Sequence, residues 1–389
     1  PRVWFSPLWY NTQVYPYGSS DYFDLFSPTA PWANAAAHVS VFELAVPMLR
    51  LYDDAKFKNM FADLRRRHIA LAMGWEALQS DTCGIGIEGF DGSNGLYYAH
   101  KIHDLGGSIN YITVDEPYTF GALYAGPSAC NWTPDQVAQN LAAQIAIVRS
   151  VFPDVIVGET EVVPPGDPRP DWLDGYQMWL DAWQRATGTP FAFVRFDVPS
   201  DLDWRPGVAA MQRVLSQRGI PFGVIYNPLS EQSTDAGWVN SAEQHFEEYE
   251  NGGSPIPDQV IFTSWNPNPE HLLPETDPTT FTHLIDRYFR VRTALAASIS
   301  GVTIQGQLTT PDTGQPLANA PVVATAIPLS GTGQEGSYIT TGTIPAGAQY
   351  VVFGVRAGTE CRWPLPASFS ISKFVLDAGK SGTISADFV

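Results

Sequence analysis

Short, almost continuously apolar runs alternate with helix-like segments through the first 300 residues of the chain. Such runs are typical of parallel strands that helices cover on both faces of the sheet. The candidate strands are residues 3–8, 39–44, 69–74, 109–114, 155–158, 191–197, 222–227 and 259–264. Eight strands with intervening helices predict an α/β fold of the (β/α)8 type, the TIM barrel. A doubly wound open sheet is the alternative, but it usually has a glycine-rich phosphate turn after its first strand, and this chain has none.

Capping residues and prolines mark where several of the intervening helices begin or end. Thr133 and Pro134 open a segment whose apolar side chains recur about once per helical turn. Asp277 and Pro278 give the same start signal later in the chain, and Gly219 is placed to end another helix. These signals support helices between the candidate strands, as the barrel requires.

The composition changes from residue 301 onward. Charged residues become sparse, and short alternating runs such as VTIQGQL and YVVFGVR are separated by Gly- and Pro-containing turns. Many short strands of this kind predict a β-sandwich. The sequence therefore predicts two domains, a (β/α)8 barrel at 1–300 and a small all-β sandwich at 301–389.

The formal net charge of −18 limits the partners of the protein. Nucleic acids and anionic membrane surfaces are not expected partners, because both are bound through clustered Lys and Arg. A neutral or cationic ligand suits an acidic field better. No apolar run reaches the roughly 20 residues that span a bilayer. These totals carry no information on the oligomeric state.

Cys83, Cys130 and Cys361 are the only cysteines, and their spacing fits no metal site. Cys83 and Cys130 both follow predicted strands, so either they form a disulfide bridge or both remain free thiols. Both alternatives stay open at this point. We expect a secreted or extracytoplasmic protein from which a signal peptide has been removed.

In a barrel of this type the functional residues lie at the carboxyl ends of the strands. Acidic residues lie at or just after the ends of five candidate strands: Glu43, Glu76, Asp115 with Glu116, Glu159 with Glu161, and Asp197. Aromatic or amide side chains at strand ends are Trp9, Trp75, Tyr226, Asn227 and Trp265. No candidate strand ends with His, Cys or Lys, and the HExxH, GxSxG and P-loop patterns are absent. Zinc, serine-hydrolase, Schiff-base and phosphate-loop chemistry therefore lack their residues, and no cofactor is expected.

What remains is carboxylate chemistry beside aromatic side chains. One carboxyl group can protonate a leaving oxygen while another attacks the anomeric carbon of a sugar or activates water. Aromatic rings offer flat apolar faces to sugar C–H groups. The combination predicts a glycoside hydrolase that cleaves a polysaccharide or oligosaccharide.

The tripeptide Asp115-Glu116-Pro117 resembles the Asn-Glu-Pro that follows strand 4 in the large clan of retaining (β/α)8 glycoside hydrolases. The resemblance extends over the predicted barrel. It implies that Glu116 is the general acid/base and that Trp265, after strand 8, lines a sugar subsite. The predicted C-terminal sandwich resembles the accessory domains that often follow such barrels.

Two positions depart from the pattern of that clan. Asp115 replaces the Asn that would bind the 2-hydroxyl group of the substrate, and Asn227 stands where the nucleophilic Glu would follow strand 7. The second catalytic carboxylate must then come from elsewhere. The candidates, in order of preference, are Glu159, Asp197 and Glu231.

The sequence therefore predicts Glu116 and Glu159 as the catalytic pair. The predicted substrate-binding residues are Trp9, Glu43, Trp75, Glu76, Asp115, Asp197, Tyr226, Asn227, Glu231 and Trp265. Structural alternatives exist, because Asp115 points away from Glu116 by strand alternation and could pair with an arginine, while the tryptophans could belong to the core. Asp197 could likewise pair with Arg195, two residues earlier. The alternative functions are a non-catalytic glycan-binding protein, and another carboxylate-based sugar enzyme such as a lyase or transglycosidase.

Overall fold

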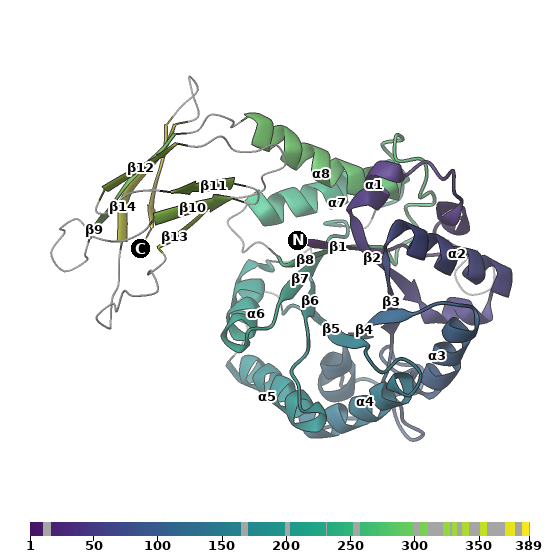
Figure 1. The fold of residues 1–389 in the computed structure, drawn as a ribbon. Helices are drawn as coiled ribbons and strands as arrows, with labels where there is room; N and C mark the ends of the chain where they lie inside the picture. The colour runs from purple at the N-terminus through teal and green to yellow at the C-terminus, as the bar shows by residue number, and fades with distance from the viewer. Residues whose placement is uncertain are drawn as a thin grey trace. The chain divides into compact units, whose positions relative to one another are not determined.

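The computed structural model describes residues 1–10, 17–164, 170–198, 203–230, 232–251 and 257–298, together with seven strands after residue 302. The chain divides into two compact units, Pro1–Asp286 and Arg287–Val389. In the first unit, a ring of strands is surrounded by helices (Figure 1). Glu231, one candidate for the second carboxylate, lies outside the described residues.

The first unit contains a closed barrel of eight strands, each paired with the next, and β1 paired with β8. All of these pairings are parallel. The strands are β1 (Arg2–Ser6), β2 (Val39–Ala45), β3 (Ala70–Trp75), β4 (Ile109–Asp115), β5 (Ile156–Val162), β6 (Val194–Asp197), β7 (Phe222–Ile225) and β8 (Gln259–Thr263). The predicted (β/α)8 barrel is confirmed, and the open doubly wound sheet is excluded.

Helices alternate with these strands and cover the outside of the barrel (Figure 1). They are α1 (Ala33–His38), α2 (Asp54–Arg67), α3 (Gly95–Asp104), α4 (Pro134–Arg149), α5 (Pro170–Thr187), α6 (Arg205–Arg218), α7 (Asp235–Asn251) and α8 (Phe281–Ser298). Shorter helical segments are η1 (Tyr22–Phe26), η2 (Val46–Arg50), η3 (Gly92–Asn94) and the π-helix η4 (Thr119–Leu123). Within the described part of the chain, no helix has the length and apolar character needed to cross a membrane.

Local capping chemistry explains where several helices begin and end. Thr133 and Gln136 form a reciprocal capping box at the start of α4, with Pro134 in the first turn. Gly219 ends α6 with a φ of 67°, the left-handed conformation that glycine adopts without strain. The predicted start at Asp277 was too early, since the Asp277 carboxylate accepts the Thr279 N–H at 2.9 Å and forms a turn before α8.

The inside of the barrel is filled by a packed apolar cluster. Its members come from seven of the eight strands or their immediate approaches: Trp4, Val41, Ala70, Ala72, Tyr111, Phe193, Ile225 and Ile261. The ring of Trp4 lies 5.2 Å from those of Tyr111 and Phe193, centroid to centroid. Because side chains alternate along a strand, these residues define which other positions face inward.

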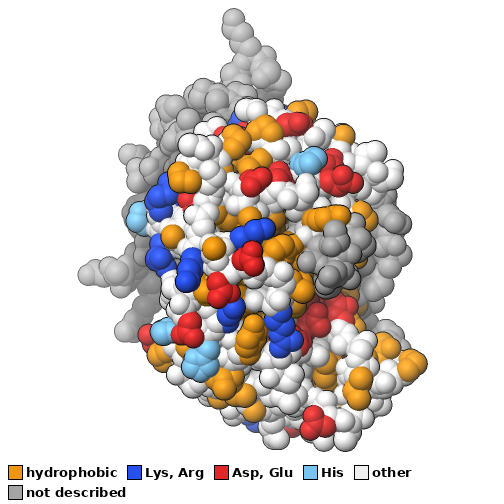
Figure 2. Space-filling model, turned by 90° about the vertical axis from the view of Figure 1, so that its right-hand side faces the viewer, with side chains coloured by type: hydrophobic (Ala, Val, Ile, Leu, Met, Phe, Trp, Pro, Cys, Tyr) orange, Lys and Arg blue, Asp and Glu red, His pale blue; other side chains and the backbone are white. Residues whose placement is uncertain are grey.

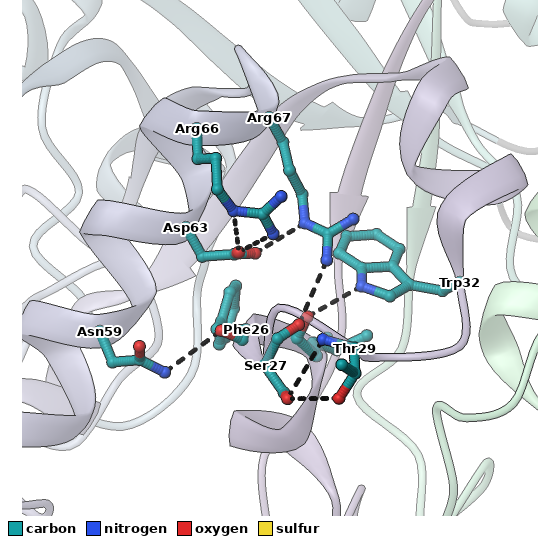
Figure 3. A network of polar contacts seen from close by, with 9 residues as sticks. Phe26, Ser27, Thr29, Trp32, Asn59, Asp63, Arg66 and Arg67 are labelled. Carbon is teal, nitrogen blue, oxygen red and sulfur yellow. Dashed lines mark hydrogen bonds and ion pairs between the residues drawn. The ribbon is translucent and has the colours of Figure 1, made fainter.

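A polar network fastens η1 to α2 on the outside of the barrel (Figure 3). Asp63, which is only 4% exposed, accepts hydrogen bonds from Arg66 and from Nε of Arg67 at 2.7 Å. The guanidinium group of Arg67 also lies over the Trp32 ring, 5.1 Å from its centroid, and donates to the Ser27 carbonyl at 3.4 Å. These contacts hold the segment between β1 and β2 in place.

Several basic residues lie on this outer side of the molecule. The helix α2 alone carries Lys56, Lys58, Arg65, Arg66 and Arg67. Figure 2 views the side formed by the right-hand helices of Figure 1, where basic and acidic side chains lie close together among apolar ones. Cations on this side can therefore pair with neighbouring surface acids.

The strands of the second unit form two antiparallel sheets. One contains β10 (Val322–Ala326), β11 (Leu329–Thr332) and β13 (Val351–Val355). The other contains β9 (Thr303–Thr309), β12 (Ser337–Thr341), β14 (Ser370–Asp377) and β15 (Thr383–Phe388). The packing of the two sheets as a sandwich stays a prediction.

Candidate active site

The end of the barrel at which the strands finish, which we call the barrel mouth, carries inward-facing acids. Tyr111 belongs to the interior cluster, so Asp115, four residues further along β4, faces inward as well. Phe193, just before β6, also belongs to the interior cluster. Arg195 and Asp197 follow it by two and four residues, so they face inward as well. Two separate strands thus bring a carboxyl group to the same end of the barrel.

Glu116 follows directly after β4 and leaves the strand in a left-handed conformation with a φ of 42°. Its N–H donates to the carbonyl of Thr160 and its carbonyl accepts from the N–H of Phe120, both at 3.0 Å. Glu116 is only 8% exposed. Burial, and then the charges of neighbouring carboxyl groups headed by Glu161, raise the pKa of Glu116 to about 10. Such a group keeps its proton at neutral pH and suits a general acid.

Asp115 and Asp197 lose their protons more readily than Glu116. Burial, followed by the charge of Glu88, raises the pKa of Asp115 to about 8 and that of Asp197 to about 7. The guanidinium group of Arg195 opposes this shift on both residues. Carboxyl groups whose pKa values are driven apart are the arrangement needed for one acid and one base in a single site.

Arg195 itself is bound to Glu43 and Thr160 beneath the barrel mouth. Its Nη1 lies 2.6 Å from Oε2 of Glu43, and its Nε and Nη2 donate to Oγ1 of Thr160 at 3.1 and 2.9 Å. The guanidinium carbon is 5.2 Å from the centroid of Trp4. Both carboxylate oxygens of Glu43 therefore accept hydrogen bonds from Arg195, which does not support the predicted role of Glu43 as a substrate ligand. The structural alternative for Asp197, an ion pair with Arg195, is not formed.

Glu159 and Glu161 lie on the outer side of β5, where Glu159 contacts α5 and Glu161 contacts η4. Glu159 accepts hydrogen bonds from the Tyr176 hydroxyl at 3.0 Å and from Nε1 of Trp179 at 2.8 Å, both on α5. Glu161 accepts from the hydroxyl group of Thr119, and burial raises its pKa to about 7. Both carboxylates are fully buried. The structure thus turns Glu159 away from the inward-facing Asp115 and Asp197, and no contact joins it to Glu116 among the described residues.

Residues 76–91, which we call the rim loop, follow β3 and are held by hydrogen bonds and a disulfide. The N–H of Leu78 donates to the carbonyl of Gly89 at 2.9 Å. Cys83 and Cys130 form the disulfide, with Cα atoms 5.1 Å apart, which decides between the two alternatives left open by the sequence. The rim loop is therefore tied to the segment that follows η4.

The rim loop brings Glu88 to the barrel mouth, a residue that the sequence did not single out. Glu88 is exposed, and its charge raises the pKa of Asp115, Glu116, Asp197 and Glu76, so it lies near these carboxyl groups. Glu88 makes no hydrogen bond or ion pair with any residue that the structure describes. Glu88 lies in the middle of a loop, so it is not among the residues at strand ends.

Two of the predicted substrate-binding aromatic residues are buried between the barrel and its helices. Trp75 is 2% exposed, and a Cβ atom added at Gly95 would lie 2.4 Å from its ring, so the ring packs against the start of α3. Tyr226 is fully buried and its hydroxyl donates to Glu250 of α7 at 2.8 Å. Neither ring is placed to form a wall of the barrel mouth.

The remaining predicted residues differ in exposure. Trp265, after β8, is 46% exposed, whereas Trp9, after β1, is 3% exposed. Asn227, after β7, is 7% exposed, and its carbonyl is 2.8 Å from Nδ1 of His245. Trp265 is therefore the ring among this group that is free to contact a ligand.

No protein-family model matches the sequence, and no curated protein matches it. Several solved barrel structures are similar. A fungal β-1,4-galactanase has 10% identity and a TM-score of 0.41, over 66% of this chain and 90% of its own. The GH53 catalytic domain of Ignisphaera aggregans has 13% identity and a TM-score of 0.43, over 68% of this chain and 87% of its own. A GH128 endo-β-1,3-glucanase of Sorangium cellulosum has 13% identity and a TM-score of 0.38, over 72% of this chain and 97% of its own. Barrel enzymes of other chemistries match as well, so these similarities do not distinguish one activity.

Proposed function

We propose that the protein is a glycoside hydrolase in which Glu116 is the general acid. The observation that carries this proposal is the position of its carboxyl group, which is buried at the end of β4 close to Glu161, Asp115 and Asp197. Its raised pKa retains the proton that a glycosidic oxygen must receive when the bond breaks. A polysaccharide or oligosaccharide is the proposed substrate, and the chemistry needs no cofactor.

We assign the second catalytic carboxylate to Asp197 and not to Glu159. Both oxygens of Glu159 accept hydrogen bonds from α5, on the far side of β5 from the inward-facing acids. Asp197 faces inward, and its charge raises the pKa of Glu116, so the two carboxyl groups act on one another. Asp197 has the lower pKa of the two and is the one suited to act in its ionised form.

In the proposed reaction, Glu116 donates its proton to the glycosidic oxygen as the bond from that oxygen to the anomeric carbon breaks. Ionised Asp197 stabilises the positive charge on the sugar ring and either attacks the anomeric carbon or takes a proton from the attacking water. In the first case, Glu116 then deprotonates a water molecule that releases the sugar from Asp197. Asp115 takes the place of the clan's Asn as a ligand for a polar substituent of the sugar, and the exposed ring of Trp265 forms an apolar sugar platform.

The disulfide supports the proposal that the protein works outside the cytoplasm. Disulfides persist in oxidising compartments and are rare where thiols are kept reduced. The Cys83–Cys130 bridge holds the rim loop, which supplies Glu76 and Glu88. A secreted enzyme acting on extracellular glycan agrees with this chemistry.

The experiment is a set of substitutions assayed for new reducing ends on a panel of polysaccharides. We expect Glu116→Gln and Asp197→Asn each to lower turnover by roughly 10²- to 10⁴-fold, the usual contribution of a catalytic proton-transfer group. Glu159→Gln tests the alternative assignment, and Glu270→Gln, at an exposed position, is the matched control. Full turnover by a folded Glu116→Gln protein would refute the assignment.

The end of β7 favours a second candidate function, a glycan-binding protein without catalysis. Asn227 stands at that strand end, where the clan has its nucleophile, and an amide cannot supply a carboxylate. Binding of polysaccharide without any new reducing ends over long incubation would support this alternative. Hydrolysis that depends on Asp197 would exclude it.

A further inference from the structure

The barrel mouth holds more carboxyl groups than hydrolysis requires. Four of them make no hydrogen bond or ion pair through their side chains with any residue in the described part of the chain: Glu88, Asp115, Glu116 and Asp197. A glycosidase needs two for proton transfer and stabilisation of the sugar cation. Glu88 in particular has no role in that step; it is exposed on the rim loop, and its charge acts on the other three.

The one cation whose charge acts on these acids is already engaged, among the residues that the structure describes. Arg195 directs its N–H groups at Glu43 and Thr160, below the carboxyl groups of the mouth. The basic residues of α2 belong to a helix of the outer layer (Figure 1). Within the described residues, the mouth is therefore a cluster of hydrogen-bond acceptors without a free cation beside it.

The side chain of Asn227 independently indicates that the mouth lacks a hydrogen-bond donor among the described residues. Its Oδ1 is buried and has no hydrogen-bond partner among the described residues, while Asn227 as a whole is 7% exposed. Its carbonyl is in contact with His245 of α7. The neighbouring Tyr226 ring packs outward against α7, so strand alternation turns the Asn227 side chain inward, on the side of Ile225. A buried acceptor of this kind is satisfied by a ligand that brings an N–H or O–H group.

We propose that the substrate carries a free, positively charged amino group, and that the barrel mouth binds this ammonium group through Glu88, Asp115 and Asn227. This inference rests on the proposed glycoside hydrolase function and gives it a substrate class, glycans containing amino sugars that are not N-acetylated. An ammonium group has three donors and one positive charge, which match an amide oxygen and unpaired carboxylates. A neutral hydroxyl or acetamido group would leave the negative charges facing one another.

The raised pKa values of the carboxyl groups at the mouth agree with this assignment. Mutual repulsion contributes to the raised pKa of Asp115, after burial, and the charges of Glu88, Glu76 and Glu43 all act in that direction. A bound ammonium group would act in the opposite direction and favour the ionised carboxylates. Charge complementarity of this kind also discriminates against neutral and anionic glycans.

The test compares matched polymers that differ only at nitrogen. Binding of the full chain carrying Glu116→Gln is measured by calorimetry with polymers of glucosamine and of galactosamine, each in the free-amine form and after complete N-acetylation. We expect at least one free-amine polymer to bind about tenfold or more tightly than its acetylated counterpart, a difference of roughly one buried charge interaction. This preference should weaken as salt is raised.

Two further variants give the inference a control. Glu88→Gln should remove most of the preference for the amine while leaving the affinity for the acetylated polymer unchanged. Glu270→Gln should alter neither. Equal binding of the two forms, or no binding of any free-amine polymer, would overturn the inference.

The two proposals can fail separately. If neutral glycans alone are cleaved and Glu116→Gln abolishes that cleavage, the hydrolase stands and the ammonium site is wrong. If free-amine polymers bind selectively but the unsubstituted protein releases no reducing ends from them, the ammonium site stands and the hydrolase is wrong.

Discussion

Arg195 on β6 and Glu43 on β2 meet across the inside of the barrel, with Nη1 2.6 Å from Oε2 and Nη2 3.2 Å from Oε1. Both residues are buried, at 4% and 7% exposure. Their strands lie opposite one another in the closed ring, so the pair joins two walls of the barrel. It also places one positive charge beneath the carboxyl groups of the mouth.

Removal of one partner of this pair should destabilise the protein strongly. We expect Arg195→Met to lower the free energy of unfolding by about 3–5 kcal/mol, because it leaves the buried carboxylate of Glu43 without its partner. Arg185→Met is the matched control, since Arg185 and Asp135 form a pair in which both side chains are 60% exposed. That substitution should cost less than about 1 kcal/mol. Equal denaturation midpoints for the two variants in urea would contradict this account.

The dependence of hydrolysis on pH should follow the assigned proton positions. Asp197 must be ionised and its pKa is about 7, so kcat/KM should rise as the pH passes this value. Glu116 must be protonated and its pKa is about 10, so activity should fall again near that pH. Because Glu161 is the first of the charges that raise the pKa of Glu116, Glu161→Gln should move the upper limb to lower pH. An optimum below pH 5 would be incompatible with these roles.

Glu161 should also make the stability of the fold depend on pH. Burial raises its pKa in the folded state to about 7, above the roughly 4.3 of an unfolded chain. The folded state therefore binds more protons, and the contribution of Glu161 to stability is full below pH 4 and declines as the pH rises through 7, by up to about 4 kcal/mol. Glu161→Gln has no proton to lose and should make the unfolding free energy depend less steeply on pH between 4.5 and about 7.5, with the remaining slope coming from the other buried acids. Glu270→Gln should retain the slope of the unsubstituted protein.

Loss of the disulfide should act on both stability and substrate binding. The bridge joins residues 47 positions apart, for which chain entropy gives a stabilisation of about 4 kcal/mol. We expect the Cys83→Ser, Cys130→Ser double variant to unfold at a lower denaturant concentration. Because the rim loop carries Glu88, KM should rise more than kcat falls. A normal KM in the folded double variant would mean that the loop keeps its position without the bridge.

The two tryptophans that follow β3 and β8 should respond differently to truncation. Trp75 is 2% exposed, and Trp75→Ala should cost about 3–5 kcal/mol of folding free energy by leaving a cavity against α3. Trp265 is 46% exposed, so Trp265→Ala should leave stability nearly unchanged and weaken glycan binding about tenfold. Thermal unfolding and binding isotherms of both variants separate these outcomes. A large loss of stability in Trp265→Ala would show that its ring belongs to the core.

The hydrophobic pattern was sufficient to predict the barrel. Buried parallel strands are apolar on both sides, so continuous runs such as residues 109–114 identify β4 without knowledge of its partners. The same continuity hides which side of a strand faces the axis. Glu159 and Glu116 therefore looked equivalent as strand-end acids, although β5 turns Glu159 toward Tyr176 and Trp179 of α5.

Contacts that form only when distant parts of the chain come together could not be predicted from the residues at strand ends. Glu88 comes close to the mouth because the rim loop folds back on itself, with Ala77 and Phe90 paired as an antiparallel bridge. The pairing of Glu43 with Arg195 joins residues that lie far apart in the sequence and meet because the barrel closes. Hydrophobic and polar patterns over a few residues do not predict such long-range contacts.

The packed cluster around Trp4 has a consequence for long polymers. Its rings occupy the barrel axis directly below Arg195, so a glycan cannot thread through the barrel. A chain that reaches Glu116 must arrive and depart on the same side of the molecule, lying crosswise over the strand ends. Both termini of such a polymer stay in solvent, and cleavage within the chain needs no free end to enter first.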